Sequence, residues 1–314
     1  MSKAILVLGG AHIDRRGRIF GETHAGASNP GAWFEEPGGG GFNAARNLAR
    51  LGHPVRMISP RGGDALGEAV AAAAIHAGID DRPFIFLDRK TPSYTAIMEQ
   101  DGNLVVALAD MELYKLFSPR RMAIRAVRDA FAAADLLLCD ANLPAETLAV
   151  IARKAADLGK PLAAIAISPA KVVRLKPCLG SIDHLFLNQA EAAALTDSHP
   201  DDALEWANQL RALGLKGGVI TRGQLPLIAF GGAQTITLQP PAIADIVDVT
   251  GAGDSLAAGV LSALMAGIDL AEAVRHGAAA AAITIQSPHA TAENLSPERL
   301  QAALALVPSA KILS

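Results

Sequence analysis

The sequence predicts an α/β fold, a doubly wound and mostly parallel sheet with helices on both faces, together with a small β-sheet lid. Three observations predict it. Short apolar runs alternate with longer Ala- and Leu-rich segments of helical spacing, which is the pattern of βαβ units. Two stretches interrupt that rhythm. With 51% hydrophobic against 19% charged residues, the 314-residue chain has enough apolar side chains for a large core.

Six short apolar runs are predicted to be parallel strands: Ala4–Leu8, Val55–Ser59, Leu136–Cys139, Leu162–Ile167, His184–Leu187 and Gly218–Thr221. Segments with helical spacing lie between them: Asn43–Leu51, Leu66–Ala77, Met122–Ala133, Ala145–Leu158 and Leu204–Leu213. After the last strand, the small and apolar stretch Gly251–Ile285 predicts two tightly packed helices. It does not predict a membrane span, because charged and His side chains interrupt it.

The two interrupting stretches are predicted to form the lid, from about residues 15–36 and 91–111 of a single domain that spans residues 1–314. The first is rich in Gly, His and charge, and the second alternates residues around the turn Asp101-Gly102. We expect a small antiparallel flap over the ends of the core strands, where α/β proteins bind ligands. An exposed flap also offers an edge to a partner, so a homodimer through the lid is expected.

Charge and cysteine content exclude several classes of function. A net charge of -3 without Lys- and Arg-rich runs provides no field for a nucleic-acid backbone or an anionic membrane. Cys139 and Cys178 lack CxxC spacing and a His cluster, so we expect two buried thiols and neither disulfide nor zinc. The first residues form an apolar run too short for a span or a signal core, which makes the cytoplasm the expected location.

The strongest local motif is Gly251-Ala252-Gly253-Asp254, followed by a helix-compatible run. Small residues at a helix start let backbone N–H groups approach a phosphate closely, and the helix N-terminus adds partial positive charge. Asp254, beside this anion hole, is placed to take the proton from an attacking hydroxyl. These roles suit phosphoryl transfer. The alternative is a tight turn in which Asp254 is an ordinary first-turn residue.

A second glycine-rich loop, Pro37 to Gly41, precedes the helix that contains Asn43. Bare backbone at Gly38 and Gly39 suits close approach of a ligand, and Asn43 has the groups to bind sugar hydroxyls. A flexible hinge with Asn43 as a helix cap is the alternative. The loop is not a Walker A motif, because no Lys-Ser/Thr follows, and Gly9-Gly10 lacks the third glycine of a dinucleotide-binding loop.

Three further polar residues follow predicted strands. Asp14 comes just after the first strand, where its carboxylate could accept two ribose hydroxyls, or else form a turn. Asn188 and Glu191 follow the strand His184–Leu187, and their spacing puts both at one face of a helix start. They suit Mg²⁺ held through water, and a helix cap with a solvated Glu is the alternative.

Taken in order, these motifs resemble those of the ribokinase-like (PfkB) carbohydrate kinases over nearly the whole chain. The resemblance implies a ribokinase-like kinase domain in which Gly251, Ala252, Gly253 and Asp254 supply the anion hole and the base. It also implies that Asn188, Thr221, Gly223, Gly251 and Gly253 bind ATP, and that Glu191 organises Mg²⁺. Asp14, Gly38, Gly39 and Asn43 would then bind the sugar. Asp248 and Thr250 would bind a monovalent cation such as K⁺ behind the anion hole.

Within the family, other segments resemble pseudouridine kinases. The residues that this resemblance assigns to the substrate are Ser28, Asn29, Tyr94, Asn142 and Lys171. Ser28 and Asn29 suit a uracil edge or a plain turn, and Lys171 suits phosphate or substrate or else solvent. The implied reaction is ATP-dependent phosphorylation of the 5′-hydroxyl of pseudouridine.

Two alternatives stay open. One is another sugar or nucleoside kinase of the same family, and the other is a ligand-binding protein that kept the fold but lost turnover. Three departures from the family pattern bear on this choice. His12 stands where these kinases usually carry Asn, Ile165-Ala166 replaces an acidic residue and proline, and Arg222 occupies a nucleotide-loop position that is more often small, Lys or Met.

Overall fold

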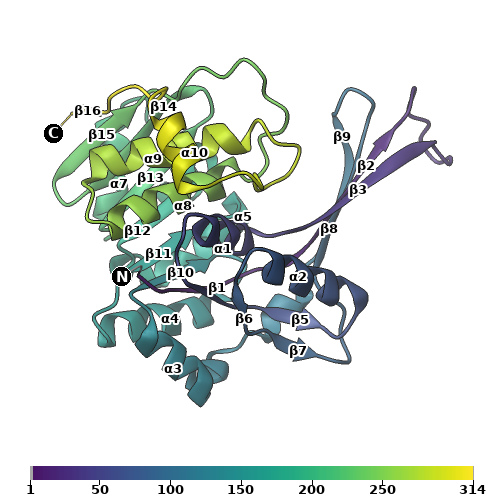
Figure 1. The fold of residues 1–314 in the computed structure, drawn as a ribbon, viewed down its shortest axis with the longest axis horizontal. Coiled ribbons are helices and arrows are strands. Elements are labelled where there is room, and N and C mark those ends of the chain that lie inside the picture. Colours follow the sequence, from purple (N-terminus) through teal and green to yellow (C-terminus); the bar gives the residue numbers. More distant parts are fainter. Residues whose placement is uncertain (1–2, 314) are drawn as a thin grey trace.

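The computed structural model describes residues 3–313, and within them ten strands form the main sheet (Figure 1). From one edge to the other, the strands are β16 (Lys311–Ile312), β15 (Gln234–Leu238), β14 (Leu225–Gly231), β13 (Gly217–Arg222), β12 (His184–Asn188), β11 (Leu162–Ile165), β10 (Leu136–Asp140), β1 (Ile5–Leu8), β4 (Val55–Ile58) and β6 (Asp80–Asp81). The strands from β13 to β6 pair in parallel, and those from β13 to β16 pair antiparallel. The prediction of a mostly parallel sheet is confirmed.

The order of the strands reverses at β1. The chain continues from β1 to β4 on one side and later returns to β10 on the other side, and both neighbours pair with β1 in parallel. Ligands of open α/β sheets bind outside the carboxyl ends of the strands at such a switch point. The topology therefore predicts a ligand site at the carboxyl ends of β1 and β10.

Helices cover both faces of the sheet. They are α1 (Gly40–Arg50), α2 (Ala65–His76), α3 (Arg125–Ala133), α4 (Ala145–Asp157), α5 (Pro169–Val172), α6 (Gln189–Thr196), α7 (Ala203–Ala212), α8 (Ala252–Met265), α9 (Leu270–Thr284) and α10 (Pro297–Leu304). Ile5 and Val7 pack in one core with α1, α2, α8, α9 and α10, whereas Leu6 and Leu8 pack in the other core with α3, α4, α6 and α7. Alternate side chains of one buried strand thus serve two apolar layers, which is why the strand is continuously hydrophobic.

One predicted helix begins later than expected. Met122 lies in a 3₁₀ turn (Pro119–Ala123), and Ile124 is extended, so α3 starts only at Arg125. The extended backbone of Ile124, with a ψ of 135°, accounts for the difference, because helical hydrogen bonding cannot continue through it. The apolar stretch near the end of the chain forms two packed helices as predicted, α8 and α9. None of the helices within residues 3–313 has the length and apolarity that crossing a bilayer requires.

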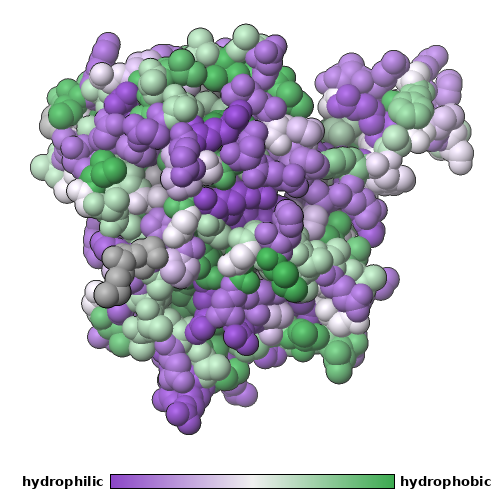
Figure 2. Space-filling model, in the orientation of Figure 1, coloured by the Kyte–Doolittle hydropathy of each residue, from purple (hydrophilic) through white to green (hydrophobic). Residues whose placement is uncertain are grey.

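A smaller sheet of four strands projects from the main body as a separate lobe (Figures 1 and 2). Its strands in order are β3 (Gly31–Gly38), β2 (His12–Ile19), β8 (Ser93–Met98) and β9 (Leu104–Asp110). Both hairpins are antiparallel as predicted, but the central pair, β2 with β8, is parallel. The expected all-antiparallel flap is wrong at this point, because both hairpins leave the main body in the same direction. A further small sheet pairs β5 (Pro60–Gly62) with β7 (Phe84–Phe86).

Candidate active site

The start of α8 leaves backbone N–H groups free. Gly251 has a φ of 76°, and a Cβ added to it would collide with the carbonyl group of Ala290. The N–H of Ala252 already donates to the carbonyl oxygen of Val249 at 3.2 Å. The N–H groups of Gly251, Gly253 and Asp254 have no acceptor among residues 3–313. The predicted anion hole is therefore corrected: Ala252 does not contribute a free N–H group, whereas Asp254 does.

The side chain of Asp254 is held by an ordered series of hydrogen bonds. Asn43 Nδ2 donates to Asp254 Oδ2 at 2.8 Å. Arg46 fixes that amide, because its Nη2 donates both to Asn43 Oδ1 at 2.6 Å and to the carbonyl oxygen of Pro37 at 2.7 Å. In the structure the Asn43 amide aims the Asp254 carboxylate. Its predicted contact with sugar hydroxyls stays a prediction.

The environment of Asp254 favours its protonated form. Burial raises the pKa of Asp254 to about 7, and the hydrogen bond from Asn43 and the charge of Arg46 only partly oppose this shift. The nearby carboxylates of Asp140 and Asp14 raise the pKa further. A carboxylate with a pKa near neutral pH is well matched to general-base catalysis.

Asp140 lies at the switch point and is fully buried. Its Oδ2 accepts hydrogen bonds from the N–H groups of Gly10 at 2.8 Å and Gly41 at 2.9 Å, and its Oδ1 accepts one from Asn142 at 2.9 Å. A Cβ on Gly9 would lie 2.6 Å from Asp140 Oδ2, and one on Gly41 would lie 2.7 Å from it. Asp140 therefore ties the end of β1 and the start of α1 to β10. Asp140 was not among the predicted site residues, although a carboxylate at the end of a buried apolar strand indicates a structural or functional role.

Asp14 and the glycine-rich loop come together as predicted. A Cβ on Gly38 would collide with Asp14 Oδ2, so only glycine permits this approach. On its other side, Asp14 Oδ1 lies 3.2 Å from His12 Nε2, and His12 Nδ1 lies 2.7 Å from the Tyr114 hydroxyl. Burial raises the pKa of Tyr114 well above its usual value, so the hydroxyl stays protonated. His12, which departs from the family pattern, is thus part of a hydrogen-bond network that orients Asp14.

Asn142 and Lys171 form a polar pair just after the carboxyl end of β10. Lys171 Nζ donates to Asn142 Oδ1 at 2.7 Å, and burial lowers the pKa of Lys171. Asn142 is only 2% exposed, yet its Nδ2 has no hydrogen-bond partner within residues 3–313. A buried amide group of this kind is costly unless a ligand or water satisfies it. This observation fits the predicted binding role of Asn142.

The predicted nucleotide residues lie next to each other at the ends of β12 and β13. Asn188 is the register partner of Thr221, and Gly223 occupies the following turn with a φ of 63°. Asn188 and Glu191 form a capping box, in which Asn188 Oδ1 accepts from the Glu191 N–H at 2.9 Å and Glu191 Oε2 accepts from the Asn188 N–H at 2.7 Å. The helix-cap alternative is therefore right about the cap but wrong about a solvated Glu, because Glu191 is buried and burial raises its pKa.

The donor set at Glu191 fits a metal ion held mostly by water and phosphate. One carboxylate and a neighbouring amide are the kind of ligands that Mg²⁺ takes from a protein when substrate phosphates supply the rest. Among residues 3–313, no three His, Cys, Asp or Glu side chains are grouped to hold a metal by themselves. A metal at this position would depend on the nucleotide.

Comparison with known proteins agrees with this geometry. The family model described as pfkB family carbohydrate kinase matches residues 4–297. The chain belongs to this family. It is 27% identical to the pseudouridine kinase of Escherichia coli (strain K12) over 93% of each chain. A solved carbohydrate kinase from Agrobacterium tumefaciens is 61% identical, has a TM-score of 0.90, and matches over 99% of this chain and 100% of that one.

A more distant structure shows the same fold. The ribokinase of Arabidopsis thaliana, solved with ribose and ATP, has a TM-score of 0.83 at 21% identity, over 97% of this chain and 99% of that one. The family match establishes a sugar or nucleoside kinase of the pfkB family, which transfers phosphate to an alcohol, and the solved structures show its ribokinase-like fold.

Not every predicted substrate residue of this pfkB kinase lies near Asp14. Tyr94 does, because it is the register partner of Asp14. Ser28 and Asn29 lie in the connection beyond the last β2–β3 pair, Ile19 with Gly31. That connection is roughly 23 Å along the strands from the His12–Gly38 pair, at 3.3 Å per residue. The amide of Asn29 bonds within its own turn, to His24 and Ala27. Within one chain these two residues are turn formers.

The predicted cation residues are also differently engaged. Asp248 Oδ1 accepts hydrogen bonds from the N–H of Thr250 at 2.8 Å and from its hydroxyl at 2.7 Å. Asp248 Oδ2 forms an ion pair with Arg16 of the smaller sheet. Both carboxylate oxygens therefore have partners within the protein, and the guanidinium of Arg16 already places a positive charge beside Asp248.

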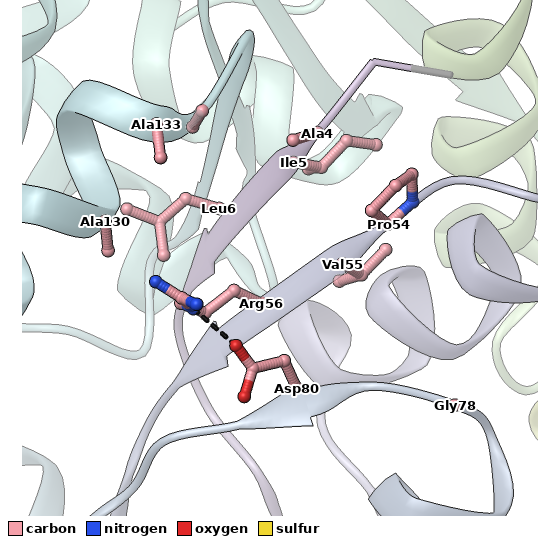
Figure 3. Close-up of a pocket in the computed structure, with 11 residues that line it drawn as sticks. Ala4, Ile5, Leu6, Pro54, Val55, Arg56, Gly78, Asp80, Ala130 and Ala133 are labelled. Atoms are coloured by element: carbon pink, nitrogen blue, oxygen red, sulfur yellow. Dashed lines mark hydrogen bonds and ion pairs between the residues drawn. The ribbon is translucent and has the colours of Figure 1, made fainter. Parts of the chain in front are cut away.

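A cavity of about 240 Å³ lies at the other end of the strands, away from the carboxyl ends (Figure 3). It is lined by the amino ends of β1 and β4 and by the end of α3, and Arg56 pairs with Asp80 within it at 2.6 Å. None of the predicted site residues lines it. Since ligands of α/β sheets bind at the carboxyl ends of the strands, this cavity is not the active site.

Proposed function

We propose that this kinase phosphorylates the 5′-hydroxyl of pseudouridine, with ATP as phosphate donor, to give pseudouridine 5′-phosphate. The observation that carries the chemistry is the pairing of Asp254, whose pKa is about 7, with free N–H groups at the start of α8. A base and an anion site that share one helix turn can act on a hydroxyl and on the phosphate that it attacks.

Each residue of the site has its own role in the transfer. Asp254 removes the proton of the 5′-hydroxyl as that oxygen attacks, while Asn43 and Arg46 keep the carboxylate aimed. The N–H groups of Gly251 and Gly253 stabilise the negative charge that develops on the transferred phosphate. When bound, ATP supplies the phosphoryl group and Mg²⁺ neutralises its charge, with Glu191 as the protein's contribution to the metal and Asn188, Thr221 and Gly223 beside the nucleotide.

The nucleoside would lie between the switch point and the smaller sheet. Asp14 has carboxylate oxygens for the ribose hydroxyls, with Gly38 and Gly39 beside them, and Asn142 offers its unpartnered amide group. Lys171 contacts Asn142, and Tyr94 is the register partner of Asp14. The smaller sheet would act as a lid that excludes water during transfer. The similarity to a pseudouridine kinase along nearly the whole chain supports this substrate.

A phosphorylation panel tests the proposal. The full-length protein is incubated with Mg-ATP and, separately, with pseudouridine, uridine, adenosine, ribose or fructose, and product is measured by mass spectrometry. We expect the highest kcat/KM with pseudouridine, with phosphate on the 5′ oxygen by ³¹P NMR. A preference for free ribose would overturn the nucleoside assignment and favour the sugar-kinase alternative. Absence of transfer to every acceptor, with ATP binding retained, would favour a ligand-binding protein.

We also propose that the protein forms a homodimer through the smaller sheet. Every residue of the edge strand β9 is exposed, including Leu104 at 59%, Val106 at 58% and Leu108 at 70%. An apolar strand with an unpaired edge favours pairing with another strand. Light scattering should give a dimer mass for the wild type and a monomer mass for Val106→Lys. A monomeric wild type at micromolar concentration would contradict this proposal.

A further inference from the structure

Arg16 of β2 connects the smaller sheet to the loop that carries the anion site. Its Nη1 pairs with Asp248 Oδ2, and its Nη2 lies 2.8 Å from Glu36 Oε1. The guanidinium also lies 4.8 Å from the centre of the Phe34 ring. The Arg16 side chain is 20% exposed, and those of Asp248 and Glu36 are 22% and 7% exposed. A planar, permanently charged group that serves two carboxylates and a ring at once differs from an ordinary surface ion pair.

Each carboxylate that Arg16 binds holds one side of Gly251. Asp248 accepts both hydrogen bonds of Thr250, the residue directly before Gly251. Glu36 accepts the N–H of Ala290 at 3.3 Å, and the carbonyl of Ala290 packs against the α-carbon of Gly251. The position of the N–H groups at the start of α8 therefore depends on two segments that share one guanidinium.

Asp248 already has a cationic partner. Its two oxygens are taken by Thr250 and by Arg16, as described above. The positive charge behind the anion site is thus already present in the chain itself.

We propose that Arg16 is a positioning residue that takes the place of a monovalent cation behind the anion site, so that this kinase works without K⁺. The inference rests on the proposed phosphoryl transfer at the start of α8. It has a second consequence: the N–H groups of the anion site are correctly positioned only while β2 and β3 of the smaller sheet contact the loop before α8. Arg16 itself touches neither the phosphate nor the acceptor.

The wild type provides the first test. Its kcat, its KM for ATP and its melting temperature are measured in 100 mM KCl and in 100 mM tetramethylammonium chloride at equal ionic strength. We expect kcat in the two salts to agree within about twofold, and the melting temperature to be the same, because no site binds K⁺ differentially. An activation by K⁺ of about tenfold or more, together with a higher melting temperature in K⁺, would overturn the proposal.

The variants Arg16→Ala and Arg15→Ala provide the second test. Arg15 is the neighbouring residue of β2 and pairs with Glu35 at 3.1 Å, its one ion pair among residues 3–313, and its side chain is 33% exposed. Loss of charge-assisted hydrogen bonds should lower kcat/KM for ATP of Arg16→Ala by about 10- to 100-fold, whereas Arg15→Ala should stay within about twofold. In Arg16→Ala the freed carboxylates should accept K⁺, so K⁺ should restore about tenfold of the loss and raise the melting temperature.

The outcomes separate this inference from the proposed function. If no acceptor is phosphorylated at all, the proposed function fails, while the melting temperatures still decide the inference. An Arg16→Ala variant with wild-type kinetics, or with no response of its melting temperature to K⁺, would overturn it. Should Arg16→Ala not fold, Arg16→Lys replaces it, because one ammonium group cannot serve both carboxylates with bidentate geometry. It should show a smaller loss and a smaller response to K⁺.

Discussion

The starts of α1 and α8 are both rich in glycine, and both have the partial positive charge of a helix N-terminus. Their surroundings differ. At α1, the N–H of Gly41 donates to the buried Asp140 at 2.9 Å, and the N–H of Phe42 donates to the Gly10 carbonyl at 3.2 Å. At α8, the N–H of Gly253 has no acceptor within residues 3–313, and a Cβ added to Gly253 would meet no atom within 4 Å.

This difference shows that glycine serves two purposes in the same motif. At α1 the glycines let the chain pack against its own carboxylates, and the helix then holds Asn43 against Asp254. At α8, Gly251 lets the chain pass the Ala290 carbonyl, whereas Gly253 leaves space beside the free N–H groups. One helix start is therefore part of the scaffold, and the other is open to a ligand.

The largest expected effect is on chemistry at α8. Asp254→Asn removes the base and should lower kcat by at least ~10²-fold while nucleotide affinity stays near that of the wild type. Because the folded state raises the pKa of Asp254, the wild type loses stability as pH rises from about 4 towards 7, and the Asn variant does not. The variant should therefore melt above the wild type at pH 8. Near-normal turnover would remove Asp254 from the mechanism.

A second effect concerns the scaffold at α1. Asp140→Asn leaves one buried N–H group without an acceptor and should lower the free energy of unfolding in urea by about 2–4 kcal/mol. Asp135→Asn is the matched control, since Asp135 lies just before the same strand but is exposed. That control should change stability by less than about 0.5 kcal/mol. Equal effects of the two substitutions would show that Asp140 does not hold the two loops together.

The pH profile tests the contact between the two helix starts. Because the base must be ionised, kcat/KM should rise about tenfold per pH unit below about 7 and level off above it. The hydrogen bond from Asn43 lowers the pKa of Asp254, so Asn43→Ala should move the rising limb to higher pH. A limb that stays in place would mean that another group controls the profile.

The smallest expected effect compares two glycines directly. Gly253→Ala should raise the KM for ATP by about tenfold and leave the melting temperature unchanged or slightly higher, because Ala suits a helix better than Gly. Gly41→Ala should instead destabilise the fold by about 1–3 kcal/mol, because its Cβ would overlap Asp140. Thermal melts and ATP titrations of both variants check this. Loss of stability in Gly253→Ala would show that the start of α8 is not open.

Local patterns predicted most of the main sheet. Strands buried on both faces are continuously apolar, and the predicted runs became β1, β4, β10, β11, β12 and β13. The antiparallel pair β14 and β15 was missed, although Leu225–Phe230 and Gln234–Leu238 flank Gly231-Gly232 as in a hairpin. The parallel pairing of β2 with β8 had no local signal, because it depends on how both hairpins leave the main body.

The amino-acid order by itself determined which groups share one turn of helix, such as Gly251 to Asp254 and Asn188 with Glu191. Neighbours along a chain keep their spacing whatever the fold does around them. Only the tertiary structure decided the partners of those groups. Asn43 meets Asp254 across 211 positions, and Arg16 meets Asp248 across 232. Such contacts depend on how strands and helices pack, so no local pattern contains them.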